Sequence, residues 1–326
     1  MSVTDVVGGS SVTGERTLVL ARPRQPQGLW SDAAARLFKI RAAAVSLVFI
    51  GLLLVVALFA PWIAPYAYDA QHLDRTWQGP SVQHFLGTDA FGRDIFSRLI
   101  YGARVSLTVA LMAQIIILLL GVPLGLVSGY TGRRIDDAIM RLVDALYSVP
   151  DVLIIIVFMA FIKQVLAQSN PGILAPLAWL DKATGGLTGV FIGIGVTYWL
   201  TVCRLVRAQV LSLKEREFVL AARAVGAGTG RILWTHLAPN CLAPVIVAAS
   251  LGVPAAIMLE AGLSFIGLGV SPPVPSWGTM VSEGVAAIRS YPHAIIAPCA
   301  AVSLTLLAFN FLGDGLRDAL DPLLKS

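Results

Sequence analysis

The side chains of this chain that could do chemistry are few, and the first of them is an acid between two long apolar runs. Glu260 stands in such a position, and an ionisable residue there is a candidate for a gate or a transport pathway. Ser264 follows one helical turn later, and Trp277 lies in the proline-rich stretch beyond. A structural alternative stays open, in which Glu260 ends a helix and accepts hydrogen bonds from nearby loop amides.

Catalytic and metal-binding patterns are weak in this sequence. The segment Gly262-Leu-Ser-Phe-Ile-Gly267 faintly resembles a serine-nucleophile setting, but its serine needs a base within hydrogen-bond reach. His293 is the histidine at that level of the chain. Asp89 and Asp94 do not have the spacing of a calcium loop, so we expect them to cap helices and form ion pairs. The sequence therefore predicts neither catalytic nor metal-binding residues.

A nucleotide site is also not expected in this chain. The glycine-rich run that begins at Gly226 reads Gly-Ala-Gly-Thr-Gly-Arg, without the lysine and the spacing of a phosphate-binding loop. Any ATP and magnesium would therefore bind on other subunits. The cysteines Cys203, Cys241 and Cys299 lie in apolar surroundings and are interpreted as small apolar residues.

The composition indicates an all-α polytopic membrane protein. Of 326 residues, 56% are hydrophobic and only 13% are charged, whereas soluble domains carry about 25% charge. A membrane-crossing helix needs about 20 mostly apolar residues. Six such segments are predicted, at residues 42–68, 105–132, 139–162, 183–203, 237–259 and 290–313. The third is the weakest, because Asp144 and Asp151 lie inside it.

The positive charges predict how the chain is oriented. Most of the 24 Lys and Arg residues fall in the N-terminal segment and in every second connection, which places both termini in the cytoplasm of a bacterial or archaeal cell. The net charge of +5 is then explained by topology, and a nucleic-acid partner is not needed. Residues 1–35 are polar and are expected to form a disordered tail.

Two connections on the outer side are too long for simple turns. Within 69–104, Ile95, Phe96, Leu99 and Ile100 fall on one side of a helix, which predicts an amphipathic helix in the membrane interface. The second connection, 260–283, is rich in proline and glycine. It is interpreted as a helix end followed by a loop that closes the outer mouth of a cavity.

The inner connection, residues 207–240, carries the strongest functional signal. Phe218, Ala221, Ala222 and Val225 fall near one face of a short helix, and Gly226 is expected to end it. A shallow face of this kind can seat in a groove of another protein. An ordinary cytoplasmic loop with a surface helix is the alternative.

Several short sequence motifs resemble those of one family of membrane proteins. The run from Glu217 to Gly226, closed by Pro239-Asn240, resembles the EAA loop of permease subunits of ABC importers, although Leu220 stands where the general motif has glutamate. Further phrases resemble the "C" subunits of dipeptide and oligopeptide permeases: Gly87 to Asp94, Leu263 to Gly269, Pro272 to Gly278 and Asn310 to Pro322. The resemblance covers residues 35–324.

This resemblance implies a six-helix, type I ABC importer permease fold and a function in ATP-driven peptide import. It implies a first transmembrane helix at 36–68, a five-helix core at 105–314 and a cytoplasmic C-terminus at 315–326. The expected partners are a second permease subunit, two cytoplasmic ATPase subunits and an extracytoplasmic substrate-binding protein. Residues expected to couple to the ATPases are Glu217, Phe218, Ala221, Ala222, Gly226 and Pro239.

Two other functions stay open at this stage. An ion-coupled secondary transporter would also bury acids in the membrane, but it would leave the long inner connection unexplained. An importer of the same class could instead carry nickel or another small solute.

Overall fold

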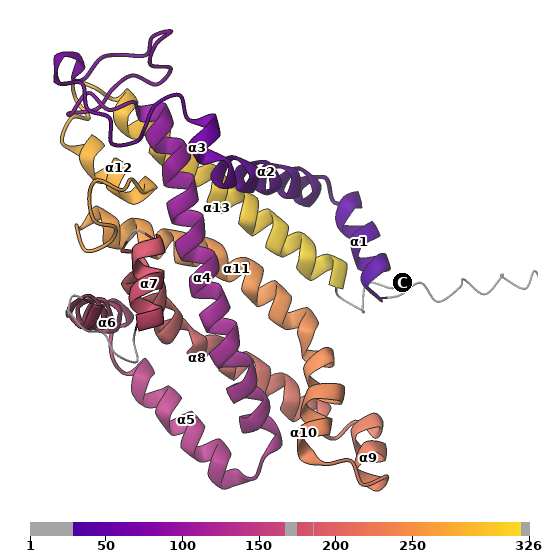
Figure 1. The fold of residues 1–326 in the computed structure, drawn as a ribbon. Coiled ribbons are helices and arrows are strands. Elements are labelled where there is room, and N and C mark those ends of the chain that lie inside the picture. The colour runs from indigo at the N-terminus through magenta and orange to yellow at the C-terminus, as the bar shows by residue number, and fades with distance from the viewer. Residues whose placement is uncertain (1–28, 167–174, 185, 321–326) are drawn as a thin grey trace, which may run out of the picture.

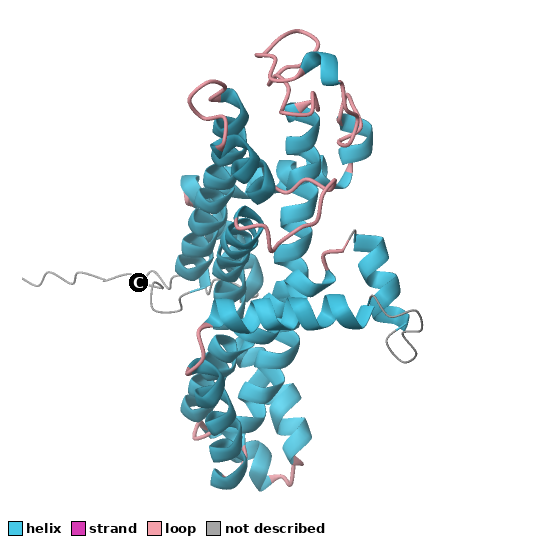
Figure 2. Cartoon of the chain, turned by 90° about the vertical axis from the view of Figure 1, so that its left-hand side faces the viewer, coloured by secondary structure: helices cyan, strands magenta, loops and turns pink. Residues whose placement is uncertain are grey.

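A computed structural model describes residues 29–166, 175–184 and 186–320. These residues are almost entirely helical, with loops gathered mainly toward the ends of the molecule (Figure 1, Figure 2). The elements are α1 (Leu29–Lys39), α2 (Arg41–Leu58), α3 (Ala60–Ile63), η1 (Leu73–Arg75), α4 (Ile95–Tyr130), α5 (Arg133–Tyr147), α6 (Asp151–Leu166), α7 (Ala175–Thr184), α8 (Thr188–Leu213), α9 (Glu217–Ala224), α10 (Thr229–Arg231), η3 (Ile232–Leu237), α11 (Ala238–Phe265), α12 (Trp277–Val285) and α13 (His293–Leu320).

Long apolar helices agree with the predicted membrane crossings. Five helical stretches in the described residues are long and apolar enough to span a bilayer: α2, α4, α8, the stretch from α10 through α11, and α13. A sixth crossing forms if α5 and α6 count as one span bent by 93°. This break falls in the segment that the sequence marked as weakest. Pro150 explains it, because proline lacks the backbone N–H and disfavours helical backbone at the residue before it.

The structure differs from the predicted amphipathic helix around residue 95. Residues 95–104 are the first turns of α4, a single helix of 36 residues, so the expected boundary between residues 104 and 105 is not found. Asp94 starts the helix by accepting a hydrogen bond from the Ser97 backbone N–H at 2.7 Å. Arg98 is buried in this first part because acids from two other segments pair with it. Charge compensation thus lets a polar helical start continue into an apolar span.

The two chain ends also extend the helical structure further than expected. Residues 1–28 and 321–326 lie outside the described part, but the last residues of the predicted tail, 29–35, belong to α1. At the other end, α13 runs without interruption to Leu320. α13 packs against α2, and a Cβ on Gly315 would stand 2.4 Å from the Cβ of Ala43. This close contact fixes the first span against the last.

The core of the molecule is the pairing of α4 with α8, the most extensive helix contact in the described chain. Gly121, Gly125 and Gly129 line the α4 side, and small residues at this spacing let backbones approach closely in lipid. A Cβ on Gly125 would lie 2.7 Å from both the backbone oxygen of Cys203 and the Cβ of Val206. Any larger residue must therefore push the two helices apart.

This packing predicts different outcomes for two helical glycines. Gly125→Ala should lower the free energy of unfolding by about 1–3 kcal/mol, because a methyl group has no room there. Gly51→Ala is the matched control, because no atom lies within 4 Å of its Cβ position on α2. It should leave stability unchanged or raise it by up to about 1 kcal/mol. Equilibrium unfolding of both purified variants checks this, and equal effects would contradict the close packing.

Candidate coupling helix and pathway residues

The helix α9 hangs at the lower end of the molecule in Figure 1, between α8 and the start of α11. Its fully buried side chain is Val219, which is 0% exposed. Val219 packs in a cluster with Ile232, Leu233 and Leu237, which follow in the same connection. Burial of a valine contributes about 1.5–3 kcal/mol. α9 is therefore attached to the protein along one side and free along the other.

A glycine ends α9, as predicted. Gly226 has φ of +81°, a left-handed conformation that favours glycine. The N–H groups after the helix close the last turn, with Ala227 donating to the Ala222 carbonyl at 3.0 Å. Arg223 adds a link to the end of α4, because its Nε donates to the Tyr130 hydroxyl at 3.2 Å. These contacts fix the direction in which α9 points.

The free side of α9 is apolar. Phe218 and Ala221 are exposed, and Val225, just beyond the helix, is 88% exposed. Ala222 lies instead on the attached side, half-buried against the cluster around Val219. Two exposed residues that the sequence analysis did not assign to this surface enlarge it, Leu220 and Trp234. Their only signal was a large apolar side chain in a charged connection.

The other predicted coupling residues lie close to this surface along the chain. Glu217 is exposed in the first turn of α9. Pro239 is exposed in the first turn of α11, after the π-helical segment η3, so the chain continues there as helix. The backbone of the whole connection from Thr229 to Phe265 can be followed as one long helical stretch. α9 packs against the first part of this stretch, so it is in direct contact with a helix that continues into a predicted membrane span.

A bidentate ion pair holds helices together at the lower end of the molecule, the end that also carries α9. Arg207 on α8 donates from Nε and Nη2 to the two carboxylate oxygens of Asp136 on α5, at 2.6 and 2.7 Å. Ser128 on α4 donates to the same carboxylate at 2.5 Å. Three helices thus meet at one acid, so the lower ends of α4, α5 and α8 are held together.

The predicted pathway residues come together toward the end of the bundle opposite to α9, but they are buried. Glu260 is 0% exposed, and its two oxygens accept hydrogen bonds from the hydroxyls of Ser264 at 2.7 Å and Ser106 at 2.8 Å. The partners are serine hydroxyls rather than the loop amides of the structural alternative. Ser264 gives its proton to a carboxylate and bonds to no histidine among the described residues, so the geometry does not support a nucleophile.

Trp277 closes the same region from the side of α12. It is 1% exposed, and its Nε1 donates to the Leu99 carbonyl of α4 at 3.1 Å. Gly102 makes room for the indole, because a Cβ there would lie 2.9 Å from it. Glu260, Ser264 and Trp277 therefore form an internal joint between α4, α11 and α12 and do not line an open passage in this structure.

A buried ion-pair cluster fastens the outer loop to α12. Arg93 donates to Asp89 at 2.7 Å and to Glu283 at 3.1 Å, and Arg98 pairs with both of these acids. Asp94 caps α4 and also bonds to His84 at 2.9 Å. The prediction that Asp89 and Asp94 serve in capping and ion pairing is confirmed. The cluster orients the end of the molecule opposite to α9.

Comparison with known families gives two matches. Residues 121–326 match the family described as binding-protein-dependent transport system inner membrane component. Residues 28–80 match the family described as the N-terminal TM domain of oligopeptide transport permease C. Together these matches cover the first span and the chain from the last turns of α4 onward.

Individual proteins are similar over most of the chain. The oligopeptide transport system permease protein OppC of Bacillus subtilis (strain 168) is 40% identical, covering 91% of this chain and 90% of that protein. The dipeptide transport system permease protein DppC of Alkalihalophilus pseudofirmus is 41% identical, with coverage of 91% of both. The glutathione transport system permease protein GsiD of Escherichia coli O6:K15:H31 is 38% identical, covering 94% of both.

Among solved structures, the MetNI methionine ABC transporter in inward-facing conformations contains a similar chain. The TM-score is 0.51 at 14% sequence identity, with 69% of this chain and 96% of that chain covered. At this identity the likeness concerns the fold alone. It confirms the predicted fold class, an all-α polytopic membrane protein built like the permease of an ABC importer.

The ion-pair cluster predicts a large cost for removing one of its cations. Arg98→Met should lower the free energy of unfolding by about 3 kcal/mol, because it leaves Asp89 and Glu283 short of a partner in a buried site. Arg133→Met is the control, because its pair with Asp137 is solvent-exposed and worth about 0–1 kcal/mol. Unfolding titrations of both variants measure the difference, and similar losses would show that burial of the cluster contributes little.

Proposed function

Because this chain belongs to the family of binding-protein-dependent transport system inner membrane components, we propose that it is the membrane-spanning permease subunit of an ATP-driven peptide importer. Its similarity to dipeptide, oligopeptide and glutathione permeases supports small peptides as the substrates. The observation that carries the coupling mechanism is the apolar free side of α9, on a helix anchored only through its other side.

In this proposal α9 is the docking element for a cytoplasmic ATPase subunit. Phe218, Leu220 and Val225 offer an apolar surface of the kind that seats in a groove of a partner, and Glu217 adds a charge beside it. ATP with its magnesium binds to the ATPase subunits, and closure of these subunits displaces α9. Because α9 is packed on η3 and η3 continues into α11, this displacement reaches the membrane part as a rigid movement.

The remaining subunits follow from the same proposal. A second, similar permease subunit pairs with this chain to form the translocation path, and two ATPases bind to the pair. A substrate-binding protein delivers peptide at the end that holds the ion-pair cluster. The chain itself catalyses no reaction.

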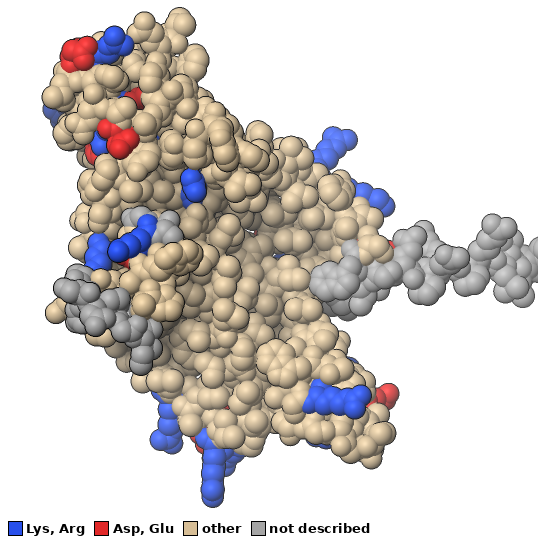
Figure 3. All heavy atoms as spheres, in the orientation of Figure 1, with Lys and Arg blue, Asp and Glu red and all other residues tan. Residues whose placement is uncertain are grey.

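The distribution of charge supports a plasma-membrane orientation with both termini in the cytoplasm. In Figure 3, Lys and Arg side chains project from the lower end and from the right-hand side, whereas the upper end carries charges of both signs. The surface between these ends is mostly uncharged, with a few Lys and Arg side chains on its left side. Positive charge on the cytoplasmic side is the usual arrangement in membrane proteins.

We propose that the buried joint of Glu260, Ser264 and Trp277 influences the gate by fixing the positions of the helices that it connects. Its residues touch α4, α11 and α12 rather than substrate, so it sets how α12 lies across the outer end of the bundle. A joint made of hydrogen bonds can hold two arrangements of similar energy when its donors exchange partners. This is a proposal about a positioning role in gating.

Two alternatives are separated by simple measurements. Uptake that persists without ATP and collapses with ionophores would favour an ion-coupled transporter. Nickel or another non-peptide solute would be favoured if it co-purifies with the cognate binding protein, as determined by mass spectrometry. Peptide uptake that requires ATP and resists ionophores is the result expected here.

The docking role of α9 predicts a specific defect. Gly226→Trp and Glu217→Lys should leave the purified four-subunit core intact but lower substrate-stimulated ATP hydrolysis at least about tenfold. Glu217→Lys reverses a charge on the free side of α9, and Gly226→Trp adds bulk and backbone strain where α9 ends. The tenfold loss corresponds to about 1.4 kcal/mol of coupling. Size-exclusion chromatography measures assembly, and ATPase assays with the loaded binding protein measure coupling.

Gly132→Trp is the control for added bulk at the same end of the molecule. A Cβ at Gly132 meets nothing within 4 Å, and this residue lies between α4 and α5, away from α9. It should keep normal stimulation. Full stimulation in both α9 variants would refute the docking role.

The positioning role of Glu260 predicts a separation of transport from assembly. Glu260→Gln keeps the shape of the side chain and one acceptor oxygen, so the complex should assemble normally. Peptide uptake should fall several-fold, because one of the two serines must accept a hydrogen bond from the new amide instead of donating one. Thr305→Ser serves as the control for a buried polar change outside the joint, because its hydroxyl bonds only within α13. Normal uptake by Glu260→Gln would assign this acid a purely structural role.

A further inference from the structure

The break between α5 and α6 leaves polar groups where a span should be continuous. α5 ends at Tyr147, α6 begins at Asp151, and the two helices meet at 93°. Non-helical backbone at membrane depth occurs only where it is buried in protein or lines a water-filled cavity. Asp151 is exposed in this single chain, so the break must face either a water-filled cavity or another protein.

The depth of this carboxylate can be read from α8. Its Oδ2 accepts a hydrogen bond from the Tyr198 hydroxyl at 2.5 Å. Tyr198 lies about ten residues after the start of α8, or about 15 Å at 1.5 Å per residue. α8 has 26 residues and is apolar enough to span a bilayer. The acid therefore lies beside the interior of a span rather than at its end.

Asp151 differs from the other acids of the bent span in having no cation. Asp136 pairs with Arg207, Asp137 with Arg133 and Asp144 with Arg204, but within the described residues no ion pair involves Asp151. Its oxygens accept only from Tyr198 and from the Val152 backbone N–H at 2.8 Å. An unpaired carboxylate at this depth is costly, so a positive charge from outside the chain would stabilise it.

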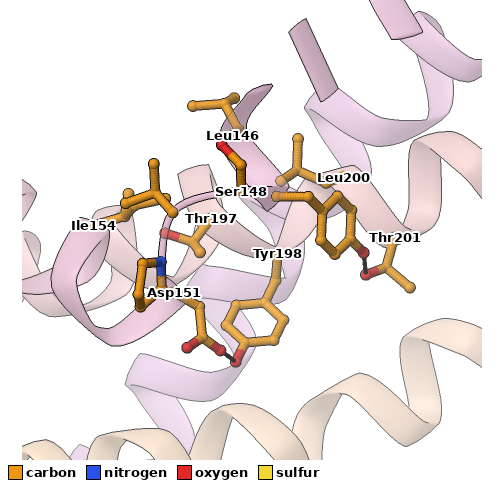
Figure 4. Close-up of a pocket in the computed structure, with 11 residues that line it drawn as sticks. Leu146, Ser148, Asp151, Ile154, Thr197, Tyr198, Leu200 and Thr201 are labelled. Carbon is orange, nitrogen blue, oxygen red and sulfur yellow. Dashed lines mark hydrogen bonds between the residues drawn. The ribbon is translucent and has the colours of Figure 1, made fainter. Parts of the chain in front are cut away.

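A pocket of about 410 Å³ opens beside this acid (Figure 4). Its size falls in the range of small-ligand sites. Asp151 and the hydroxyls of Tyr198, Tyr147 and Thr201 give it a polar side, and the last two are 2.7 Å apart. Leu146 and Ile154 are among its apolar walls. The pocket thus combines one anion, several hydroxyl groups and an apolar surface.

We propose that this pocket binds the protonated amino terminus of a peptide on its way through the membrane. The Asp151 carboxylate pairs with the ammonium group, a charge-assisted contact. The Tyr147 and Thr201 hydroxyls bond to the first peptide group, and the apolar wall receives the first side chain. This inference rests on the proposed function of peptide import.

Charge-selective labelling of an introduced thiol tests this site in the assembled complex. Ser148→Cys places the thiol on the pocket wall, in a Cys299→Ser background, since the other two cysteines are buried. A trimethylammonium methanethiosulfonate should react about tenfold faster than a sulfonate analogue, because the carboxylate attracts cations. Asp151→Asn should abolish this preference. Trialanine should slow the labelling at least threefold, and N-acetyl-trialanine should not.

Asp137→Asn, in the same bent span but outside the pocket and paired with Arg133, is the matched control and should keep the preference. Equal rates for both reagents, or no protection by trialanine, would overturn the site. Loss of the second permease subunit from the Asp151→Asn complex would also overturn it, by assigning the carboxylate to a cation of that subunit. ATP-driven uptake of peptide by the unmodified complex is measured separately. If uptake is absent, importer function itself fails, whereas uptake with an unprotected thiol rejects only the pocket.

Discussion

The close approach of α4 and α8 is the constraint on which the rest of this structure depends. Three glycines on α4 let the two backbones touch, and no larger residue fits at Gly125. Because the helices are joined along their length, α8 carries three features into fixed places: Tyr198 beside the mid-span pocket, Arg207 in the lower ion pair, and the connection that leads to α9. The pocket and the lower ion pair are thus held in place by one helix pair, and the connection to α9 leaves from the end of that pair.

The two ends of the molecule are stabilised by different physical means. The end that holds Arg93 and Arg98 relies on charge pairs, with both arginines neutralised by Asp89 and Glu283. The end that carries α9 relies on a buried apolar residue, Val219, together with one bidentate ion pair. A buried ion-pair cluster is costly to disrupt, whereas a short helix with one fully buried side chain is more easily displaced. In the proposed importer, this difference makes α9 the part that moves in response to a partner.

Much of the fold could be predicted from the sequence, since apolar length defines membrane spans and glycine spacing defines their contacts. The motif from Glu217 to Gly226 also located the short helix α9, for which the coupling role is proposed. The start of α4 could not be predicted, because Arg98 is neutralised by acids from distant segments, one of them 185 residues away. The inward orientation of Ala222 and the burial of Glu260 among serines likewise depend on tertiary packing. Asp151 made the prediction of the third span weaker. The pocket beside it could not be predicted, because residues from α5, α6 and α8 form it together.

The central claim is that the free side of α9 is gripped by a separate nucleotide-hydrolysing subunit, and site-directed crosslinking tests it most directly. A photoreactive side chain at Val225, which is 88% exposed, should form a crosslink to an ATPase in the native membrane. The same probe at the buried Val219 should not. The yield should change when ATP is added, as the partner closes. Crosslinks from Val225 to lipid or water alone, with an assembled complex present, would contradict the account.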